Sequence, residues 1–189
     1  PYNLRLENSP DPAPRAGEVL VKVEAAIHEK ARLTKGETVL VSAGGGGVGV
    51  AASQLAKVVG AIVITTVGSA KKAEQARRIG ADHTIHYKEI DFVAEVQKIT
   101  DGKGVDVILE MLSDVNLAND LTVLGPGGRV IVVGCRGTIE INPREMMMRE
   151  ADIRGVQLPK ATPEEKRSIY AAVGAGLCGG VLRPIVGRE

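Results

Sequence analysis

The sequence predicts an α/β protein with a doubly wound, parallel sheet of six strands. From Thr38 onward, short apolar runs alternate with segments of helical periodicity, which is the pattern of repeated strand–helix units. The runs are rich in valine and isoleucine, as expected of strands covered by helices on both faces. A glycine cluster, Gly44–Gly49, separates the first run from the first helical segment. Together these features favour the strand order 3-2-1-4-5-6 of a Rossmann fold.

Each expected element is bounded by residues that start or stop it. Strands are expected over residues 38–43, 61–67, 82–87, 105–111, 130–134 and 153–158. Helices are expected from residue 48 and over residues 69–78, 91–100, 113–124, 143–148 and 163–177. Asp91, Asn142 and Thr162 have the residue type of helix N-caps. A proline follows directly after the last two, where it suits the first helical position.

Residues 1–27 differ from this alternating part. Leu4–Glu7 and Glu18–Ala26 have the pattern of two strands, and the proline-rich segment Pro10–Pro14 between them cannot be helical. Two strands alone are marginal in water, so this pair needs a larger sheet to join.

The composition favours one substantial core with a small appendage, since 44% of the 189 residues are hydrophobic. The formal net charge is +1, so the overall balance indicates neither a nucleic-acid nor a membrane partner. The longest apolar region is interrupted by Gln54, Lys57 and Gly60, which argues against a membrane span. The two cysteines lie far apart and no apolar leader opens the chain, so we expect a cytoplasmic protein.

Gly44, Gly46 and Gly49 fit the motif G-x-G-x-x-G between a strand and a helix. In such a turn the first glycine allows the bend, the second lets backbone amides reach a pyrophosphate, and the third lets helix and strand touch. The helix start adds free N–H groups and a positive dipole end. A loop that is merely flexible is the alternative, but the strand before it and the helix after it favour dinucleotide binding. The predicted contacts are Gly44, Gly45, Gly46, Gly47, Val48 and Gly49.

The end of the second strand predicts which dinucleotide binds. An acidic residue there would hydrogen-bond the ribose 2′-hydroxyl of NAD, but the sequence has Gly68 and Ser69, followed by Lys71 and Lys72. Lysines in the first turn of a helix oppose its dipole unless an anion compensates, and a 2′-phosphate is such an anion. Either lysine alone is more simply a solvated helix residue. Because the carboxylate is missing as well, we predict NADP(H), held by Gly68, Ser69 and Lys72.

Further cofactor contacts are expected in the loops that follow the other strands. Tyr87, at the end of the third strand, can pack on the adenine or donate to the phosphate, or it is simply a surface tyrosine. Groups after strands four, five and six would hold the ribose and the carboxamide in a sheet of this order. These residues are Asn116, Val133, Gly134, Cys135, Arg136, Val156, Gln157 and Leu158.

No residue is identified as a catalytic acid, base or nucleophile. Cys135 has no histidine near it in the sequence, so a small buried cysteine is the simpler interpretation. His28, His83 and His86 do not form a metal-ligand cluster, and no metal is expected. The run Met146–Met148 is interpreted as core or interface.

Six segments carry a resemblance to a known family: Glu37–Ser42, Gly46–Gly49, Glu110–Leu112, Asn116–Leu117, Gly127–Gly134 and Arg136–Pro143. They resemble the zeta-crystallin type of NADPH:quinone oxidoreductase, from the zinc-free branch of the medium-chain dehydrogenase/reductase superfamily. The resemblance runs without gaps from about Gly36 to Ile185. It implies a homo-oligomer that pairs through the edge of the sixth strand and a secondary ability to bind RNA. It also implies NADPH contacts at Gly45–Val48, Gly68, Tyr87, Asn116, Val133–Arg136 and Val156–Leu158, which agrees with the prediction from the residues.

The resemblance also implies a domain division and an activity. Residues 1–28 would be a remnant of a GroES-like catalytic domain, residues 29–160 the NADP-binding Rossmann domain, and residues 161–189 a shortened C-terminal helix and strand. The implied activity is NADPH-dependent reduction of quinones or related enones by hydride or electron transfer. Most of the catalytic domain is absent from this sequence, so two alternatives stay open: a catalytically impaired module that binds NADPH or RNA, and a subunit that assembles with a full-length homologue.

Overall fold

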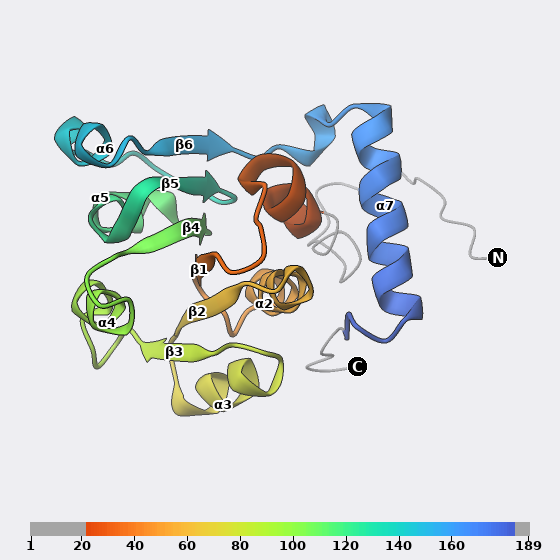
Figure 1. Ribbon diagram of the computed structural model, residues 1–189, viewed down its shortest axis with the longest axis horizontal. Coiled ribbons are helices and arrows are strands. Elements are labelled where there is room, and N and C mark those ends of the chain that lie inside the picture. Colours follow the sequence, from red (N-terminus) through yellow and green to blue (C-terminus); the bar gives the residue numbers. More distant parts are fainter. Residues whose placement is uncertain (1–21, 184–189) are drawn as a thin grey trace.

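The computed structural model describes residues 22–183 and contains one sheet of six parallel strands (Figure 1). The strands are β1 (Thr38–Val41), β2 (Ile62–Val67), β3 (His83–His86), β4 (Val105–Glu110), β5 (Leu124–Val132) and β6 (Asp152–Gly155). Their order is β3-β2-β1-β4-β5-β6, which confirms the predicted Rossmann topology. Successive strands are added toward one edge of the sheet from β1 to β3 and toward the other edge from β4 to β6. The switch point therefore lies between β1 and β4, and ligands bind at this position in sheets of this kind.

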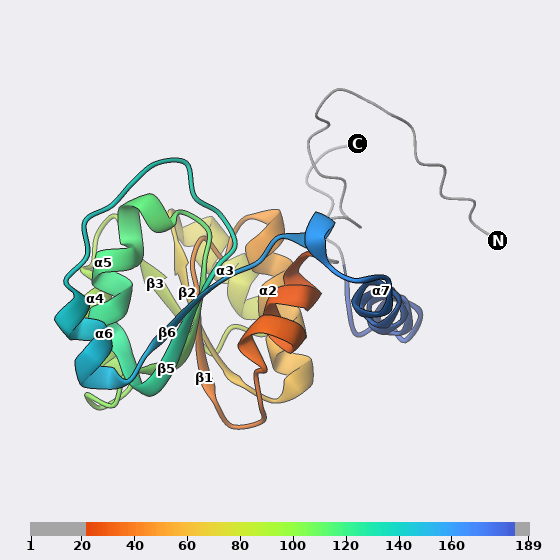
Figure 2. The same cartoon turned by 90° about the horizontal axis from the view of Figure 1, so that it is seen from above.

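Helices cover both faces of the sheet (Figure 2). On one side lie the π-helix η1 (Ala25–Ala31), α2 (Gly47–Val59), α3 (Ala70–Arg78) and α7 (Pro163–Cys178). On the other side lie α4 (Phe92–Ile99), α5 (Ser113–Val123) and α6 (Pro143–Arg149). A short 3₁₀-helix, η2 (Leu158–Lys160), precedes α7.

The strand residues divide between two hydrophobic cores. Val39 and Val41 pack in the core under α2 and η1, whereas Leu40 packs in the core under α4 and α5. All three side chains are fully buried. Successive strand residues point to opposite faces, so both faces of the central strand must be apolar. This explains why the strands read as continuous apolar runs.

Most predicted elements are found within one or two residues of their expected bounds, but two strands differ. β5 begins at Leu124 instead of residue 130, because the glycine-rich segment 125–128, between the predicted helix and the predicted strand, belongs to the strand. A side chain at Gly104 would place its Cβ 2.5 Å from the backbone nitrogen of Gly125. Only glycines allow β4 and β5 to approach so closely. β6 ends at Gly155, and residues 158–160 form η2 instead of continuing the strand.

The predicted strand over residues 18–26 is wrong in its described part. Residues 22–24 are α-helical, and Ala25–Ala31 continue as a π-helix. Val23, Ile27 and Ala31 are spaced four apart, and each is at most 1% exposed. Helical spacing therefore buries these side chains together, which an extended strand would not do. The predicted strand at 4–7 and the segment 10–14 lie outside the described residues.

Arg129 fastens η1 to the sheet. Its guanidinium donates to the carbonyl oxygens of Ala31 and Arg32, at 2.5 and 3.2 Å, and forms two bonds to Glu37, at 2.7 and 2.9 Å. Burial alone would raise the pKa of Glu37, but the hydrogen bonds and charge of Arg129 outweigh it and hold this pKa below its usual value. The pair therefore stabilises the fold above about pH 4.5, and this contribution is lost as the carboxyl is protonated.

Replacing Arg129 by methionine should destabilise the protein by about 3 kcal/mol at pH 7, because Glu37 keeps its charge in a mostly buried place without a partner. Urea unfolding would measure the loss. Arg78→Ala is the matched control, since Arg78 pairs with Glu74 on an exposed surface, where such pairs contribute at most about 1 kcal/mol. Equal losses in the two variants would contradict this account, as would a loss from Arg129→Met that does not shrink at acidic pH.

Candidate functional site

The glycine loop between β1 and α2 is shaped by contacts that leave no room for side chains. A Cβ on Gly44 would lie 1.8 Å from Thr65 Oγ1, and one on Gly49 would lie 2.4 Å from the carbonyl oxygen of Ala43. Ala43 itself has a φ of 56°, in the left-handed region that few residues other than glycine adopt. The helix and the strand thus touch at Gly49, as the motif predicts.

The start of α2 offers donors to a ligand. Within the described residues, no side chain caps this end of the helix at its N-cap, Gly46. The first amides of a helix have no partner inside it, so those of Gly47, Val48 and Gly49 are available to an anion. The first helical amide with a backbone acceptor is that of Val50, which donates to Gly46 at 2.9 Å. This arrangement fits the diphosphate of a dinucleotide.

Residues after β2 and β3 meet beside this loop. A Cβ on Gly45 would lie 2.7–2.8 Å from three carbons of the Lys72 side chain, so the stem of this lysine lies over the loop. Ser69 is the N-cap of α3, and its hydroxyl accepts a bond from the backbone N–H of Lys72 at 3.3 Å. A Cβ on Gly68 would lie 3.0 Å from the hydroxyl oxygen of Tyr87. The four residues predicted for the 2′-phosphate corner are therefore neighbours.

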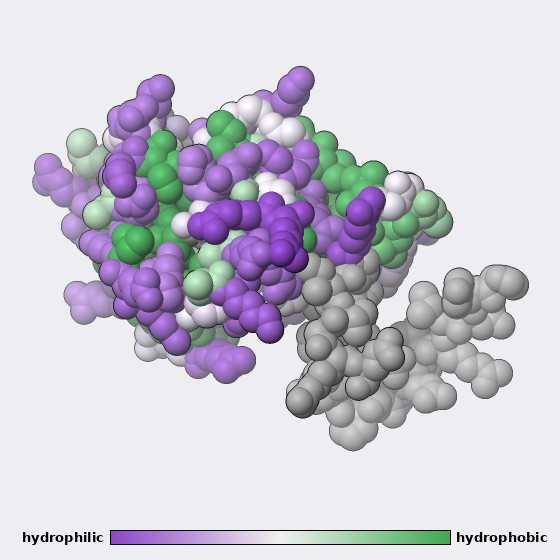
Figure 3. All heavy atoms as spheres, turned by 90° about the horizontal axis from the view of Figure 1, so that it is seen from below, coloured by the Kyte–Doolittle hydropathy of each residue, from purple (hydrophilic) through white to green (hydrophobic). Residues whose placement is uncertain are grey.

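The surface over this corner is hydrophilic. Figure 3 shows hydrophilic residues across the middle of the lower face, where α3 lies, and apolar residues toward the end that carries α7. Lys71 and Lys72 are both exposed on α3. Tyr87 is 52% exposed, so its ring is accessible to a ligand.

A buried carboxylate, Glu110, lies at the end of β4, beside the glycine loop. One of its oxygens accepts from the hydroxyl of Ser42 at 2.5 Å, and the other accepts from the N–H of Leu112 at 2.5 Å and the amide of Asn116 at 3.1 Å. Asp120, one turn further along α5, is also fully buried. These residues line a cleft of about 310 Å³ that also includes Tyr87. The sequence prediction placed Asn116 here but missed Glu110, Ser42 and Asp120 as members of the site. The signal was present, since Asn116 and Asp120 are four apart on a helix that follows an apolar strand ending in glutamate.

The loop after β5 continues this line of strand ends. A Cβ on Gly134 would lie 2.3 Å from the carbonyl oxygen of Met111, so the loops after β4 and β5 are in contact. The backbone N–H of Arg136 donates to Asp114 at 3.0 Å. Val133 is buried, and its carbonyl oxygen accepts from Lys22 at 2.7 Å. Neighbouring strands are about 4.8 Å apart, so the ends of β1, β4, β5 and β6 form a row of about 15 Å.

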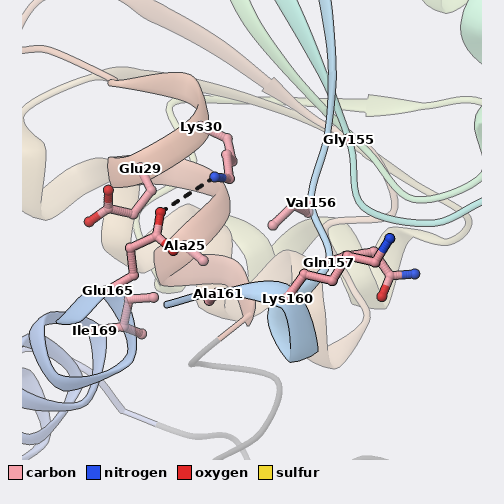
Figure 4. A pocket seen from close by; sticks show the side chains of 10 residues that line it. All are labelled: Ala25, Glu29, Lys30, Gly155, Val156, Gln157, Lys160, Ala161, Glu165 and Ile169. Carbon is pink, nitrogen blue, oxygen red and sulfur yellow. Dashed lines mark ion pairs between the residues drawn. The ribbon is translucent and has the colours of Figure 1, made fainter. Parts of the chain in front are cut away.

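Val156 and Gln157, after β6, line a different cavity. This cavity has a volume of about 200 Å³ and lies between η1, η2 and α7, as Figure 4 shows. Lys30 and Glu165 form an ion pair of 3.7 Å across it. Leu158 is the first residue of η2. The predicted site residues therefore follow one row of strand ends, but Val156 and Gln157, at the end of that row, line a separate cavity.

Two other predictions need correction. Cys135 is exposed instead of buried, and its thiol lies 3.2 Å from the carbonyl oxygen of Gly137, because the loop after β5 turns outward beyond Val133. Met147 and Met148 are 66% and 64% exposed, whereas Met146 packs against the core under α5. The core interpretation of this run thus holds for one methionine of three, and the interface alternative stays a prediction for Met147 and Met148.

Neither a metal cluster nor a membrane helix is found in the part of the chain that the structure describes. Among residues 22–183, no three or more His, Cys, Asp or Glu side chains are grouped so that they could hold a metal ion. Over the same residues, none of the helices has both the length and the apolar character that crossing a bilayer requires.

The fold and the glycine-lined turn define a Rossmann-type domain. The chain belongs to the zinc-binding dehydrogenase family, whose model matches residues 47–173.

Comparisons with individual proteins agree with this family. Human quinone oxidoreductase is 43% identical over 165 residues, which are 87% of this chain and 50% of the human protein. The chain thus spans about half the length of the curated relatives it matches. The crystal structure of Escherichia coli quinone oxidoreductase complexed with NADPH has a TM-score of 0.82 and 28% identity, over 91% of this chain and 55% of that chain. The structure of a 2-haloacrylate reductase has a TM-score of 0.83 and 29% identity, over 87% of this chain and 53% of that chain.

Two glycines of the loop should respond differently to alanine. Gly49→Ala forces backbone against backbone at the β1–α2 contact and should cost about 2–3 kcal/mol of stability. Gly47→Ala meets nothing within 4 Å and should be neutral or up to about 1 kcal/mol stabilising, because alanine favours the helix. Chemical unfolding of both variants checks this. Similar values for the two would mean that the close approach at Gly49 does not matter.

Proposed function

We propose that this chain binds NADPH and serves the reduction of quinones or related enones by hydride transfer. The observation that carries the proposal is the corner beside the glycine loop. There the stem of Lys72 lies over Gly45, Ser69 is the N-cap of the same helix, and the residue that follows β2 is Gly68 instead of an acidic residue. The relatives support it, since one is named a quinone oxidoreductase and another is a quinone oxidoreductase complexed with NADPH.

The proposed contacts follow the row of strand ends. The free amides of Gly47, Val48 and Gly49 would hold the diphosphate, with Gly44, Gly45 and Gly46 forming the loop beside it. Gly68, Ser69, Lys72 and Tyr87 would hold the 2′-phosphate and adenine. Beyond the diphosphate, Asn116 and the loop Val133–Arg136 would hold the second ribose, and Val156–Leu158 the carboxamide. A cation and a hydroxyl suit a phosphate, whereas a carboxylate at this position would repel it.

When bound, NADPH would supply the hydride that the quinone or enone accepts, and the protein would supply orientation and electrostatics. The glycine loop and the row of strand ends would fix the cofactor along the edge of the sheet. We assign no acid or base to this chain.

Oxidation of NADPH with a simple quinone such as 1,4-benzoquinone tests the proposal. Steady loss of the reduced-cofactor absorbance is expected, at a rate proportional to protein concentration. Binding of NADPH without turnover would favour the alternative of a cofactor-binding module. The absence of both NADPH binding and NADPH oxidation would overturn the proposal.

We also propose that copies of the chain pair through the outer edge of β6, which among the described strands pairs with β5 alone. Sedimentation analysis would test this pairing, and mixing with a full-length homologue would test the alternative of a subunit. RNA binding and a cytoplasmic location stay predictions.

Removing the 2′-phosphate contacts should change the cofactor preference. The double variant Ser69→Ala/Lys72→Ala should bind NADPH more weakly by about 1–3 kcal/mol, because it loses charge-assisted hydrogen bonds. NADH affinity should stay within about twofold. Fluorescence titration of both nucleotides measures this.

Lys71→Ala is the control for that experiment, since it removes the same charge one residue away from the lysine whose stem lies over Gly45. Its NADPH affinity should change much less. Unchanged NADPH affinity in the double variant would remove the argument for a phosphate site.

A further inference from the structure

We propose that Asp120 is a positioning residue for the cofactor site, because it shares a proton with Glu110 and so keeps one negative charge beneath the cleft. This inference rests on the proposed binding of NADPH. Neither Asp120 nor Glu110 was among the residues that the sequence singled out for the cofactor.

The two carboxyl groups form a closed pair. Both residues are 0% exposed. Glu110 accepts bonds from Ser42, Leu112 and Asn116, whereas no N–H or O–H donor of the described residues reaches either oxygen of Asp120. The group within hydrogen-bonding reach of Asp120 is the carboxyl of Glu110. Two carboxylates that are in contact and fully buried cannot both be ionised, so one must carry a proton.

The proton resides on Asp120. Burial, and then the charge of Glu110 and the hydrogen bond to it, raise the pKa of Asp120 to about 9. Asp120 therefore donates to Glu110 at neutral pH. The carboxylate of Glu110 then has donors from Ser42 directly after β1, from the loop after β4 and, through Asn116 and Asp120, from two positions on α5. This one group holds together three elements that surround the cleft.

The pair is connected directly to the proposed cofactor contacts. Asn116, which is expected to hold the ribose, donates to Glu110 at 3.1 Å. Ser42, which donates to the other oxygen, directly precedes Ala43 at the start of the glycine loop. Loss of the Asp120 proton would add a second negative charge under a site for a diphosphate and would drive Glu110 away from Asp120. Both effects weaken binding of an anionic cofactor.

Other titratable groups near the pair are few. Tyr87 is the one further titratable side chain among the residues that line this cleft. On α4, Glu95 and Lys98 pair with each other at 3.4 Å. On α6, Arg149 pairs with Glu145 and donates to the carbonyl oxygens of Thr122 and Leu124. On α5 itself, Asp114 accepts from the backbone of Arg136. Lys72, the proposed phosphate contact, is present in both the wild type and the Asp120 variant, so comparing these two proteins controls for it, whereas Tyr87 is controlled by substitution.

The first experiment measures the shared proton without any cofactor. The folded protein keeps a proton on Asp120 that the unfolded chain loses near pH 4, so stability falls as pH rises from about 4 to about 9. Asp120→Asn donates to Glu110 without titrating. The melting temperature of the variant should therefore rise relative to the wild type by about 5 °C or more between pH 5 and pH 9. Asp101→Asn, the same change at an exposed position, should show no such trend.

The second experiment measures the coupling to the cofactor. The dissociation constant of the wild type for NADPH should increase about tenfold between pH 7.5 and pH 10, as a second charge develops under the site. In Asp120→Asn it should change by less than about threefold. Both measurements are made in a Tyr87→Phe background as well, which removes titration of the tyrosine.

Three outcomes decide the proposal. The pH-dependent difference in melting temperature, together with the flatter NADPH profile of Asp120→Asn, would support it. Parallel NADPH profiles of wild type and variant would overturn it while leaving the proposed function intact. Absence of NADPH binding at every pH would overturn the proposed function and the coupling together, although the melting data would still report the shared proton.

If Asp120→Asn does not fold, the infrared carbonyl band of a protonated carboxyl in the wild type decides, since its absence at pH 7.5 would overturn the shared proton.

Discussion

The close approach of backbone to backbone at the start of α2 is the constraint on which the rest of this structure depends. Gly49 lies against Ala43 and Gly44 with no space for a Cβ. This contact fixes the angle at which α2 leaves β1 and aims its free amides along the switch point of the sheet. Gly44 is held against Thr65 of β2 in turn, so the loop belongs to the sheet and cannot move independently of it.

Arg129 and Glu110 each hold several elements together, at opposite ends of the strands. At one end, Arg129 joins β5 to η1 and to Glu37 through five hydrogen bonds, including one to the carbonyl oxygen of Asp106. At the other end, Glu110 accepts bonds from Ser42 directly after β1, from α5 and from the loop between β4 and α5. The first arrangement uses a full ion pair to hold η1 against the sheet. The second uses a single buried carboxylate to hold the walls of a cleft, with polar groups that a ligand can also approach.

Local patterns predicted the fold well because each carries its own physical signal. Apolar runs, N-caps such as Asn142 and Thr162, and the glycine motif all act over a few residues, and the structure places the helices and strands accordingly. The failures involve contacts distant in sequence. The helix at 22–31 is stabilised by packing on the sheet, and β5 begins early because Gly104 and Gly125 touch. The spacing of Asn116 and Asp120 places both on the side of α5 near Glu110, but the pairing of Glu110 with Asp120 also depends on burial, which spacing alone does not predict. Cys135 is exposed because of how its loop turns.

The contact of Lys72 with Gly45 has a consequence for selectivity. A free lysine side chain samples many rotamers, and immobilising it on a ligand can cost up to about 2 kcal/mol of conformational entropy. Here three carbons of the stem already rest on the loop, so only the terminal ammonium must still be ordered. A phosphate arriving at this corner would meet a charge that is partly preorganised, and discrimination between the two nicotinamide dinucleotides would gain from the lower entropic cost as well as from the charge.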